Sequence, residues 1–288
     1  MPEVWANAGT SGLPYQRIPG VFIQHGCVAK YSPAVFNLQI FWLSQDNNGQ
    51  ALVLMGSGYK VSTISTPAVA QAMAKYSTIS DAIGYVYQQG THVFYVLTFP
   101  SADATWVYDA STNLWHEECS IDQNGAEHRV RGNCTAFAYG QNIVGDWQNG
   151  NLYALDINNQ TENGNPIIRR RGFPHIVNDG KLAQHVQFIA NMETGQTPAG
   201  VGEPTSNVSG LFGEPQLEPT IYLRWSDDRG NSWGEPIGQS MGATGEYITR
   251  PSWRDLGQSF DRVYELYWSE DVNTALNGAY LDAMPLPI

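Results

Sequence analysis

The chain has 288 residues with a formal net charge of −12, so it is not expected to grip the phosphates of nucleic acid through Lys and Arg. Three cysteines without a Cys-x-x-Cys pair argue against a disulfide framework, and we expect buried, reduced thiols. No run reaches the length of a membrane span, and no secretion signal is visible, so we expect synthesis in the cytoplasm. No phosphate-binding Gly-rich loop with its lysine is present, and we expect no cofactor. Plentiful Gly, Tyr and Trp favour short strands and tight turns, hence one all-β domain over residues 1–288.

Three hairpins of similar content follow one another in the first half of the chain. They span Phe36–Gly56, His92–Trp115 and Gln141–Thr161, and in each two apolar runs flank a turn, such as Asn149-Gly150. The aspartates that close the second strands of the last two hairpins, Asp109 and Asp156, lie 47 positions apart. That period fits the blades of a β-propeller, whose repeats run to about 40–50 residues.

Propeller blades have four strands, so each hairpin needs an outer strand on either side. The sequence predicts these outer strands at Val21–Ala29 and Tyr59–Ile64, at Ala82–Tyr87 and Leu114–Glu118, and at Thr135–Tyr139 and Pro166–Arg171. One connector helix is predicted within Ser65–Ser77, where Ser65 or Thr66 can cap and Pro67 suits the first turn. Its Val69, Met73 and Tyr76 have helical spacing and should pack on a blade.

The second half contains a long loop and then a dense cluster of strands. The stretch 191–219 is rich in Gly, Pro and Glu, and we interpret it as an interface loop. The strand-rich C-terminal block that follows contains TIYLRWS, EYITRPSW, RVYELYWS and TALNGAYLDA. In RVYELYWS, Val263 and Tyr267 fall on one face and Tyr264 and Trp268 on the other, which is typical of a half-buried strand.

The stretch from Ser226 to Trp233 has the spacing of the Asp box, a hairpin signature of sialidases and some other β-propellers. We interpret it as structural: Asp228 accepts N–H bonds in the turn, Gly230 supplies a positive φ, and Trp233 folds into the core. Arg17-Ile18-Pro19 resembles a sialidase stretch whose arginine holds a carboxylate. A glycan-binding or sialidase-like propeller is therefore the alternative interpretation, and it predicts glycan binding, with or without cleavage.

Other patterns that could carry chemistry are weak. Ser240 lies in a Gly-x-Ser-x-Gly pattern, but a strand-like segment follows it where a nucleophile elbow needs a helix. His25 and Cys27 lack a second ligand pair for a metal. We assign no catalytic, cofactor-binding or metal-binding residue and expect no enzyme. Candidate anchors of an interface with other copies are Trp5, Trp147 and Trp253, with core packing as the alternative for each.

Several stretches resemble, in the same order, the tail hub or nozzle proteins of short-tailed bacteriophages, also described as packaged-DNA stabilisation proteins. They are PYQRIPGVFIQHGCVA, FWLSQDNNGQ, GYKVSTIST, ISDAIGYVYQQGTHVFYVLTFPSADATWVYDASTNLWHE, IVGDWQNGNLYALD, WSDDRGNSWGEP, GEYITRPSWRDLGQSFDRVYELYWS and LNGAYLDA. The resemblance runs along most of the chain, although the family members compared are longer at the N-terminus.

This resemblance implies a structural virion protein of a phage tail. It would form a ring of identical copies, expected to be sixfold, below the portal and its adaptor. Such a ring would continue the DNA channel, retain packaged DNA as a passing cargo and carry fibres, spikes or a needle. The acidic balance agrees with a channel that does not bind phosphates.

Overall fold

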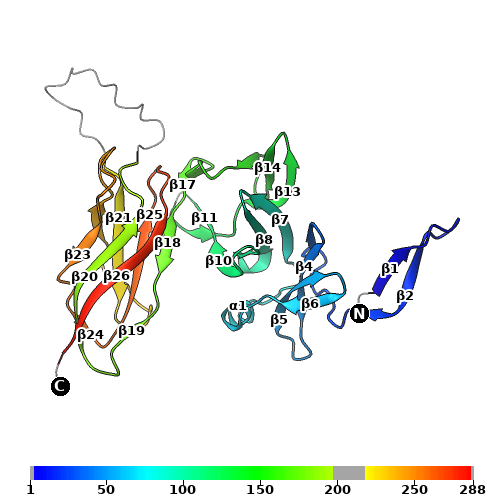
Figure 1. Ribbon diagram of the computed structural model, residues 1–288, viewed down its shortest axis with the longest axis horizontal. Coiled ribbons are helices and arrows are strands. Elements are labelled where there is room, and N and C mark those ends of the chain that lie inside the picture. The colour runs from blue at the N-terminus through cyan, green and yellow to red at the C-terminus, as the bar shows by residue number, and fades with distance from the viewer. Residues whose placement is uncertain (1–2, 123, 197–217, 287–288) are drawn as a thin grey trace, which may run out of the picture. The chain divides into compact units, whose positions relative to one another are not determined.

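The structure is a computed structural model that describes residues 3–122, 124–196 and 218–286 (Figure 1). The chain is all-β with one α-helix among these residues, as predicted. It divides into two compact units, Met1–Asp156 and Ile157–Ile288, where the sequence predicts one propeller-like domain. The physical reason for the difference is that each unit has apolar clusters of its own, built from its own strands.

The first unit contains three successive antiparallel sheets, each an up-and-down meander of neighbouring strands. The first sheet is β3 (Ala34–Phe36), β4 (Gln39–Gln45), β5 (Ala51–Ser57) and β6 (Lys60–Thr63). The second is β7 (Ile83–Gln89), β8 (His92–Phe99), β9 (Ala104–Asp109) and β10 (Leu114–Glu118), and the third is β13 (Gly132–Ala138), β14 (Gln141–Asp146) and β15 (Leu152–Leu155). The first two are the predicted four-stranded blades, whereas the third has three strands.

The blades pack face to face because the middle one is apolar on both sides. Along β8, Tyr95 and Leu97 belong to the cluster shared with the first blade, while Val96 faces the third blade together with Val144. Adjacent residues of a strand point to opposite faces, so this alternation fills two interblade cores with one strand. Phe41 of the first blade stacks on Tyr95 with ring centroids 5.3 Å apart.

All three predicted hairpins are confirmed, as are four of the predicted outer strands. Two outer strands were placed wrongly. The first blade takes β3 as its outer strand instead of Val21–Ala29, where a strand continues only to Phe22. Pro166–Arg171 does not complete the third blade, because β18 (Arg169–Gly172) pairs with a strand of the second unit.

The connector helix α1 (Pro67–Met73) is confirmed with its predicted cap. The Thr66 hydroxyl accepts from the N–H of Val69 at 3.3 Å, and Pro67 occupies the first turn. Val69 and Met73 are buried in the cluster between the first two blades. The other short elements of this unit are the 3₁₀ turn η1 (Pro100–Ala102) and the strand pairs β1 (Glu3–Asn7) with β2 (Tyr15–Phe22) and β11 (Ser120–Ile121) with β12 (Glu127–His128).

The second unit is a β-sandwich. One sheet contains β18, β25 (Asp261–Trp268), β21 (Thr220–Ser226) and β22 (Ile237–Ser240), with β19 (Ile176–Val177) also paired to β25. The other contains β20 (Ala183–Met192), β23 (Ser252–Arg254), β24 (Gln258–Ser259) and β26 (Leu276–Pro285). Their facing sides share one core, which includes Leu223 and Leu266, and in it the ring of Phe188 on β20 lies 5.0 Å from that of Tyr264 on β25. A small pair, β16 (Thr161–Glu162) with β17 (Asn165–Pro166), precedes the sandwich in the chain.

The strand cluster at the C-terminus is confirmed, with two differences. The long loop predicted at 191–219 begins later, because β20 continues to Met192, and residues 197–217 of that loop lie outside the described residues. EYITRPSW is not a continuous strand: only Ser252 and Trp253 of this stretch join β23. Positive φ angles at Gly242 and Gly245 turn the chain just before it.

Candidate functional site

The Asp box forms a closed turn after β21. Asp228 Oδ1 accepts from the Ser226 hydroxyl at 2.6 Å and from the N–H of Ser232 at 2.8 Å, while Oδ2 accepts from the Ser232 hydroxyl at 2.6 Å. The Ser226 oxygen in turn accepts from the N–H of Gly230 at 2.7 Å, and Gly230 has φ 90°. These hydrogen bonds lower the pKa of Asp228 to about 2 because they favour the carboxylate. The carboxylate holds the turn, as the sequence predicts.

Trp233 differs from its prediction as a core side chain. It is half-buried and covers the guanidinium of Arg224, which lies 4.8 Å from the centre of the indole. Arg224 also pairs with Glu265, with Nη2 2.6 Å from Oε1. Arg224 and Glu265 are register partners on β21 and β25, and their side chains lie on the face of the sheet opposite the core residues Leu223 and Leu266. Trp233 therefore fastens the box to the outside of the sandwich through a cation–π contact.

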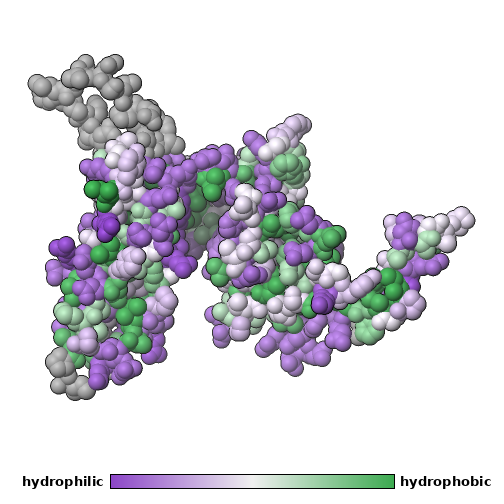
Figure 2. Space-filling model, in the orientation of Figure 1, coloured by the Kyte–Doolittle hydropathy of each residue, from purple (hydrophilic) through white to green (hydrophobic). Residues whose placement is uncertain are grey.

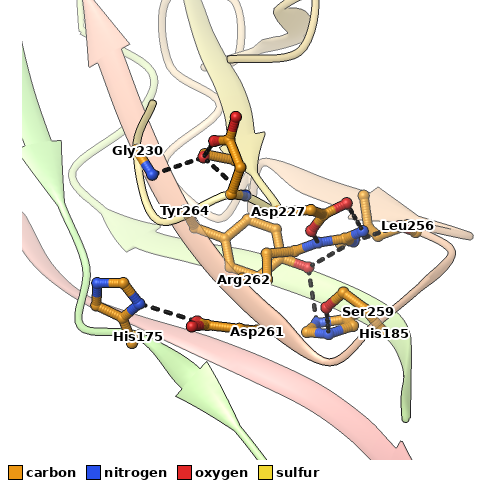
Figure 3. A network of polar contacts seen from close by, with 11 residues as sticks. His175, His185, Asp227, Gly230, Leu256, Ser259, Asp261, Arg262 and Tyr264 are labelled. Carbon is orange, nitrogen blue, oxygen red and sulfur yellow. Dashed lines mark hydrogen bonds and ion pairs between the residues drawn. The ribbon is translucent and has the colours of Figure 1, made fainter. Parts of the chain in front are cut away.

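Beside the box, a chain of hydrogen bonds enters the sandwich (Figure 3). Arg262 is buried and binds Asp227 with two bonds, Nε to Oδ1 at 2.6 Å and Nη2 to Oδ2 at 2.8 Å. Its Nη1 donates to the hydroxyl oxygen of Tyr264 at 3.5 Å. Tyr264 then contacts Nδ1 of His185 at 2.9 Å, and Nε2 of His185 lies 2.9 Å from the Ser259 hydroxyl.

Arg262 begins this series of hydrogen bonds as a donor. Arg262 can only donate, so the oxygen of Tyr264 accepts from it. The two ring nitrogens of His185 then bridge the hydroxyl groups of Tyr264 and Ser259. Burial and the nearby charge of Arg262 both lower the pKa of His185, so the ring is neutral at pH 7.

This constellation is suited to holding strands together. A serine nucleophile must be open to a substrate, whereas the side chains of Ser259 and His185 are both buried. Since His185 lies on β20, Ser259 on β24 and Tyr264 on β25, the hydrogen bonds join the two sheets of the sandwich.

A hollow of about 460 Å³ borders the box. Its acidic side chains are already engaged: Asp227 pairs with Arg262, and Asp261 accepts from Arg229 at 2.9 Å and contacts His175 at 2.8 Å. Both carboxylates are therefore already bound to basic side chains. The hollow therefore does not present the paired free acid and base that glycoside cleavage requires.

The remaining residues singled out from the sequence do not converge on one site. Arg17 pairs with Glu3 across the β1–β2 hairpin, Nε to Oε1 at 3.1 Å. Ser240 ends strand β22 and donates to Glu218, and no helix follows it directly. Within the described residues, no group of three or more His, Cys, Asp or Glu could hold a metal ion. The three cysteines are exposed, contrary to the expectation of burial.

The three candidate tryptophans have different environments. Trp253 is 2% exposed, donates from its indole nitrogen to the Ile237 carbonyl at 2.7 Å and belongs to the sandwich core. It therefore follows the core alternative and cannot anchor another copy. Trp147 is 36% exposed and lies against Arg129, 4.0 Å from the guanidinium carbon, while Trp5 is 49% exposed. Only Trp5 and Trp147 offer accessible indole surface.

The first unit also exposes large apolar side chains at both ends of its row of blades. They are Val35, Leu38 and Ile40 around β3 and β4, and Phe137, Tyr139 and Leu152 around β13 and β15. Figure 2 shows hydrophobic areas on the surface of each unit, interspersed with hydrophilic areas of the same unit. Exposed apolar patches on a blade are suited to contacts with other protein. The helices of the described residues include none with the length and apolarity needed to cross a membrane.

Comparisons with known proteins identify two regions of the chain. Residues 2–160 match the family model described as bacteriophage P22 Gp10, beta-propeller, and residues 174–284 match the model described as bacteriophage P22 Gp10, beta-sandwich. The two matches agree with the blades of the first unit and the sandwich of the second. No curated protein matches the chain.

Among solved structures, the chain is similar to a glycoside hydrolase family 43 arabinoxylan arabinofuranohydrolase from Bacillus subtilis, in complex with cellotetraose. The identity is 10% and the TM-score 0.19, over 94% of this chain and 55% of the other. A TM-score this low supports no conclusion about fold or activity. The chain belongs to the family of bacteriophage P22 Gp10, tail proteins that stabilise packaged DNA.

Proposed function

We propose that copies of this protein form a ring in the phage tail, below the portal and its adaptor. The ring continues the DNA channel, keeps the packaged genome from leaking and anchors other tail parts such as fibres, spikes or a needle. Its assembly takes place in the host cytoplasm.

The observation that carries this proposal is the match of both parts of the chain, in order, to the propeller and sandwich of one tail protein family. A role in stabilising packaged DNA needs a part that closes the exit of the head and stays attached to it. Closed rings of identical copies are the usual protein solution for enclosing a channel.

Surface chemistry supports contacts between copies. The apolar side chains at the two ends of the row of blades differ from each other, with Val35 and Ile40 at one end and Phe137 and Leu152 at the other. A ring needs such heterologous contacts, in which one surface of a copy meets a different surface of the next. Trp5 and Trp147 add exposed aromatic surface, a side-chain type that often dominates interface energies.

Charge supports a channel through which DNA passes without binding. The net charge of −12 repels phosphates on average, so the protein should retain DNA by blocking its exit and not by gripping it. Retention of DNA by a physical block should also depend little on salt concentration, because no counterions are released from the phosphates.

The proposal is tested by producing phage particles without this protein and measuring how much packaged DNA stays inside. Particles lacking the protein should package DNA and then lose it to added nuclease, and supplying the wild-type protein should restore protection. Full protection of the DNA in particles shown by mass spectrometry to lack the protein would contradict the proposal.

A further inference from the structure

Strand β26 is an edge of the sandwich (Figure 1). It is ten residues long and pairs antiparallel with β20 along its length, while β23 and β24 occupy the other side of β20. Strands in globular proteins are usually about five or six residues long, so this is a long edge.

One row of backbone groups on β26 points away from its partner. The N–H of Leu286 donates to the Leu182 carbonyl at 3.0 Å, which fixes the side facing β20. Successive N–H groups of a strand point alternately toward one neighbour and toward the other. The register irregularity near His185 adds its extra residue, Val186, to β20, so the alternation along β26 is not interrupted there. The outward N–H groups are therefore those of Ala283, Leu281 and Ala279, and no other described strand pairs with them.

The usual devices that protect an edge are few on β26. Proteins blunt edges with short strands, bulges, Lys, inward charges or Pro within the strand, and the bulge of β26, where Asn277 has no register partner on β20, lies at the beginning of the strand. Here the only charged side chain is Asp282, and the only proline, Pro285, is the last residue. By contrast β22, an edge of the other sheet, has only four residues. On the solvent face of β26, Tyr280 is 63% exposed and Met284 54% exposed.

We propose that β26 is a docking edge that receives an extended segment of a different tail polypeptide as an added strand. The inference rests on the proposed place of the protein in the tail. Main-chain bonds to Ala279, Leu281 and Ala283 supply the affinity, as in other cases of strand addition. The segment carries apolar side chains beside Tyr280 and Met284, and a Lys or Arg beside Asp282.

Two features favour a different polypeptide over a second copy. Two β26 edges that pair with each other create a two-fold contact, which closes a dimer and does not build a ring. A second β26 also has no Lys or Arg to place beside Asp282, whereas a basic segment of another polypeptide forms an ion pair there.

Amide hydrogen exchange of the full chain, alone and in purified tails, tests the edge directly. In the isolated protein the amides of Ala279, Leu281 and Ala283 should exchange rapidly, and in tails they should slow by at least about tenfold because they gain carbonyl partners. Amides of β8, buried in the middle blade, should be slow in both samples. Equal exchange rates at the three edge amides in tails that contain the protein would overturn the docking edge but leave the proposed function intact. Absence of the protein from tails would overturn the proposed function instead.

A photo-crosslinker identifies the occupant. Replacing Tyr280 with p-benzoylphenylalanine keeps an aromatic ring at an exposed position, so folding should be unaffected. Illumination of tails should cross-link position 280 to a segment of another tail polypeptide. The same probe in place of Tyr247, which is also exposed, measures the background of cross-linking. Cross-links from position 280 to a second copy, or none above that background, would overturn the proposal.

Discussion

His185 shows how a single buried side chain sets the behaviour of the sandwich. Its ring lies fully inside the protein, with one nitrogen on Tyr264 and the other on Ser259, and Arg262 provides a positive charge nearby. Adding a proton would place a second buried cation near Arg262. Neutral His185 thus stabilises the native state, and a charged one does not.

This predicts a pH dependence of stability. An unfolded histidine takes up a proton near its ordinary pKa of about 6.5, whereas native His185 resists until lower pH because its pKa is lowered. Its contribution is therefore complete above about pH 6.5 and declines below, with a slope of at most about 1.4 kcal/mol per pH unit. Urea unfolding at pH 7, 6 and 5 should show this slope in the wild type and lose it in His185→Gln.

The matched control is His175→Gln, which changes an exposed histidine bonded to Asp261 in the same unit. It should keep the slope caused by His185. Carboxylates with lowered pKa values, such as Asp228, do not contribute to this slope. Their stabilising charge is lost only as the pH falls below about 4. Identical slopes in the wild type and His185→Gln would contradict the role given to His185.

The three tryptophans should separate stability from assembly. Trp253→Ala empties part of the sandwich core and should cost about 3–5 kcal/mol in the free energy of unfolding. Trp5→Ala removes an exposed ring and should cost less than about 1 kcal/mol, whereas Trp147→Ala also loses a hydrogen bond to the Val130 carbonyl and the cover of Arg129 and should cost about 1–3 kcal/mol. Both should reduce incorporation into tails. Chemical unfolding and quantitative blotting of purified tails measure the two effects. Normal incorporation of both exposed-site variants would remove them from the ring interface.

At the scale of elements, packing between the first two blades depends on Gly84 of β7. A Cβ built there would lie 2.3 Å from the Ser32 carbonyl oxygen and 2.9 Å from the ring of Tyr95. Tyr95 cannot move freely, because its hydroxyl donates to that same oxygen at 2.8 Å. The strand and the preceding segment therefore approach each other at a distance that only glycine permits.

Gly84→Ala should lower the free energy of unfolding by about 1–3 kcal/mol or more, because the added methyl group forces the blades apart. Gly150→Ala is the matched control in the same unit, since a Cβ there meets no heavy atom within 4 Å. Thermal unfolding followed by circular dichroism measures both. A Gly84→Ala protein as stable as the control would show that the first two blades do not pack this closely.

The elements that sequence could predict are those defined by neighbouring residues. Hairpins were found because apolar runs flank a turn, and α1 because Thr66, Pro67 and an apolar face coincide. The outer strand β3 has only three residues, too few for a periodic pattern. The pairing of β18 with β25 joins segments about a hundred residues apart, and no local signal reports such a partner.

The same distinction holds for the candidate site. The Asp box was visible because Ser226, Asp228 and Gly230 lie within five residues and bond to one another. The buried chain from Arg262 to His185 was missed because Arg262 and Tyr264 lie on β25 but His185 lies on β20, and no sequence spacing connects the two strands. Trp233 was identified as part of the box, but its partner Arg224 could be found only once β21 and its turn were folded.

At the scale of the whole molecule, the two units should unfold as separate thermal transitions. Each has its own apolar core, and the family models match each part with a domain of its own. Calorimetry of the full chain should resolve two transitions, with Gly84→Ala lowering only one and Trp253→Ala lowering only the other. A single transition shifted by both substitutions would show that the units unfold as one.

The central claim is that this protein is a ring-forming component of a phage tail. Electron cryomicroscopy of tails purified from virions that carry the protein tests it most directly, with wild-type tails and tails of the Trp5→Ala, Trp147→Ala double variant reconstructed in parallel. We predict a closed ring, sixfold or of similar symmetry, below the portal, into whose density the blades and the sandwich fit, and incomplete rings in the variant. Virions that contain the protein only as single copies, or a ring whose density does not accommodate these two units, would contradict it.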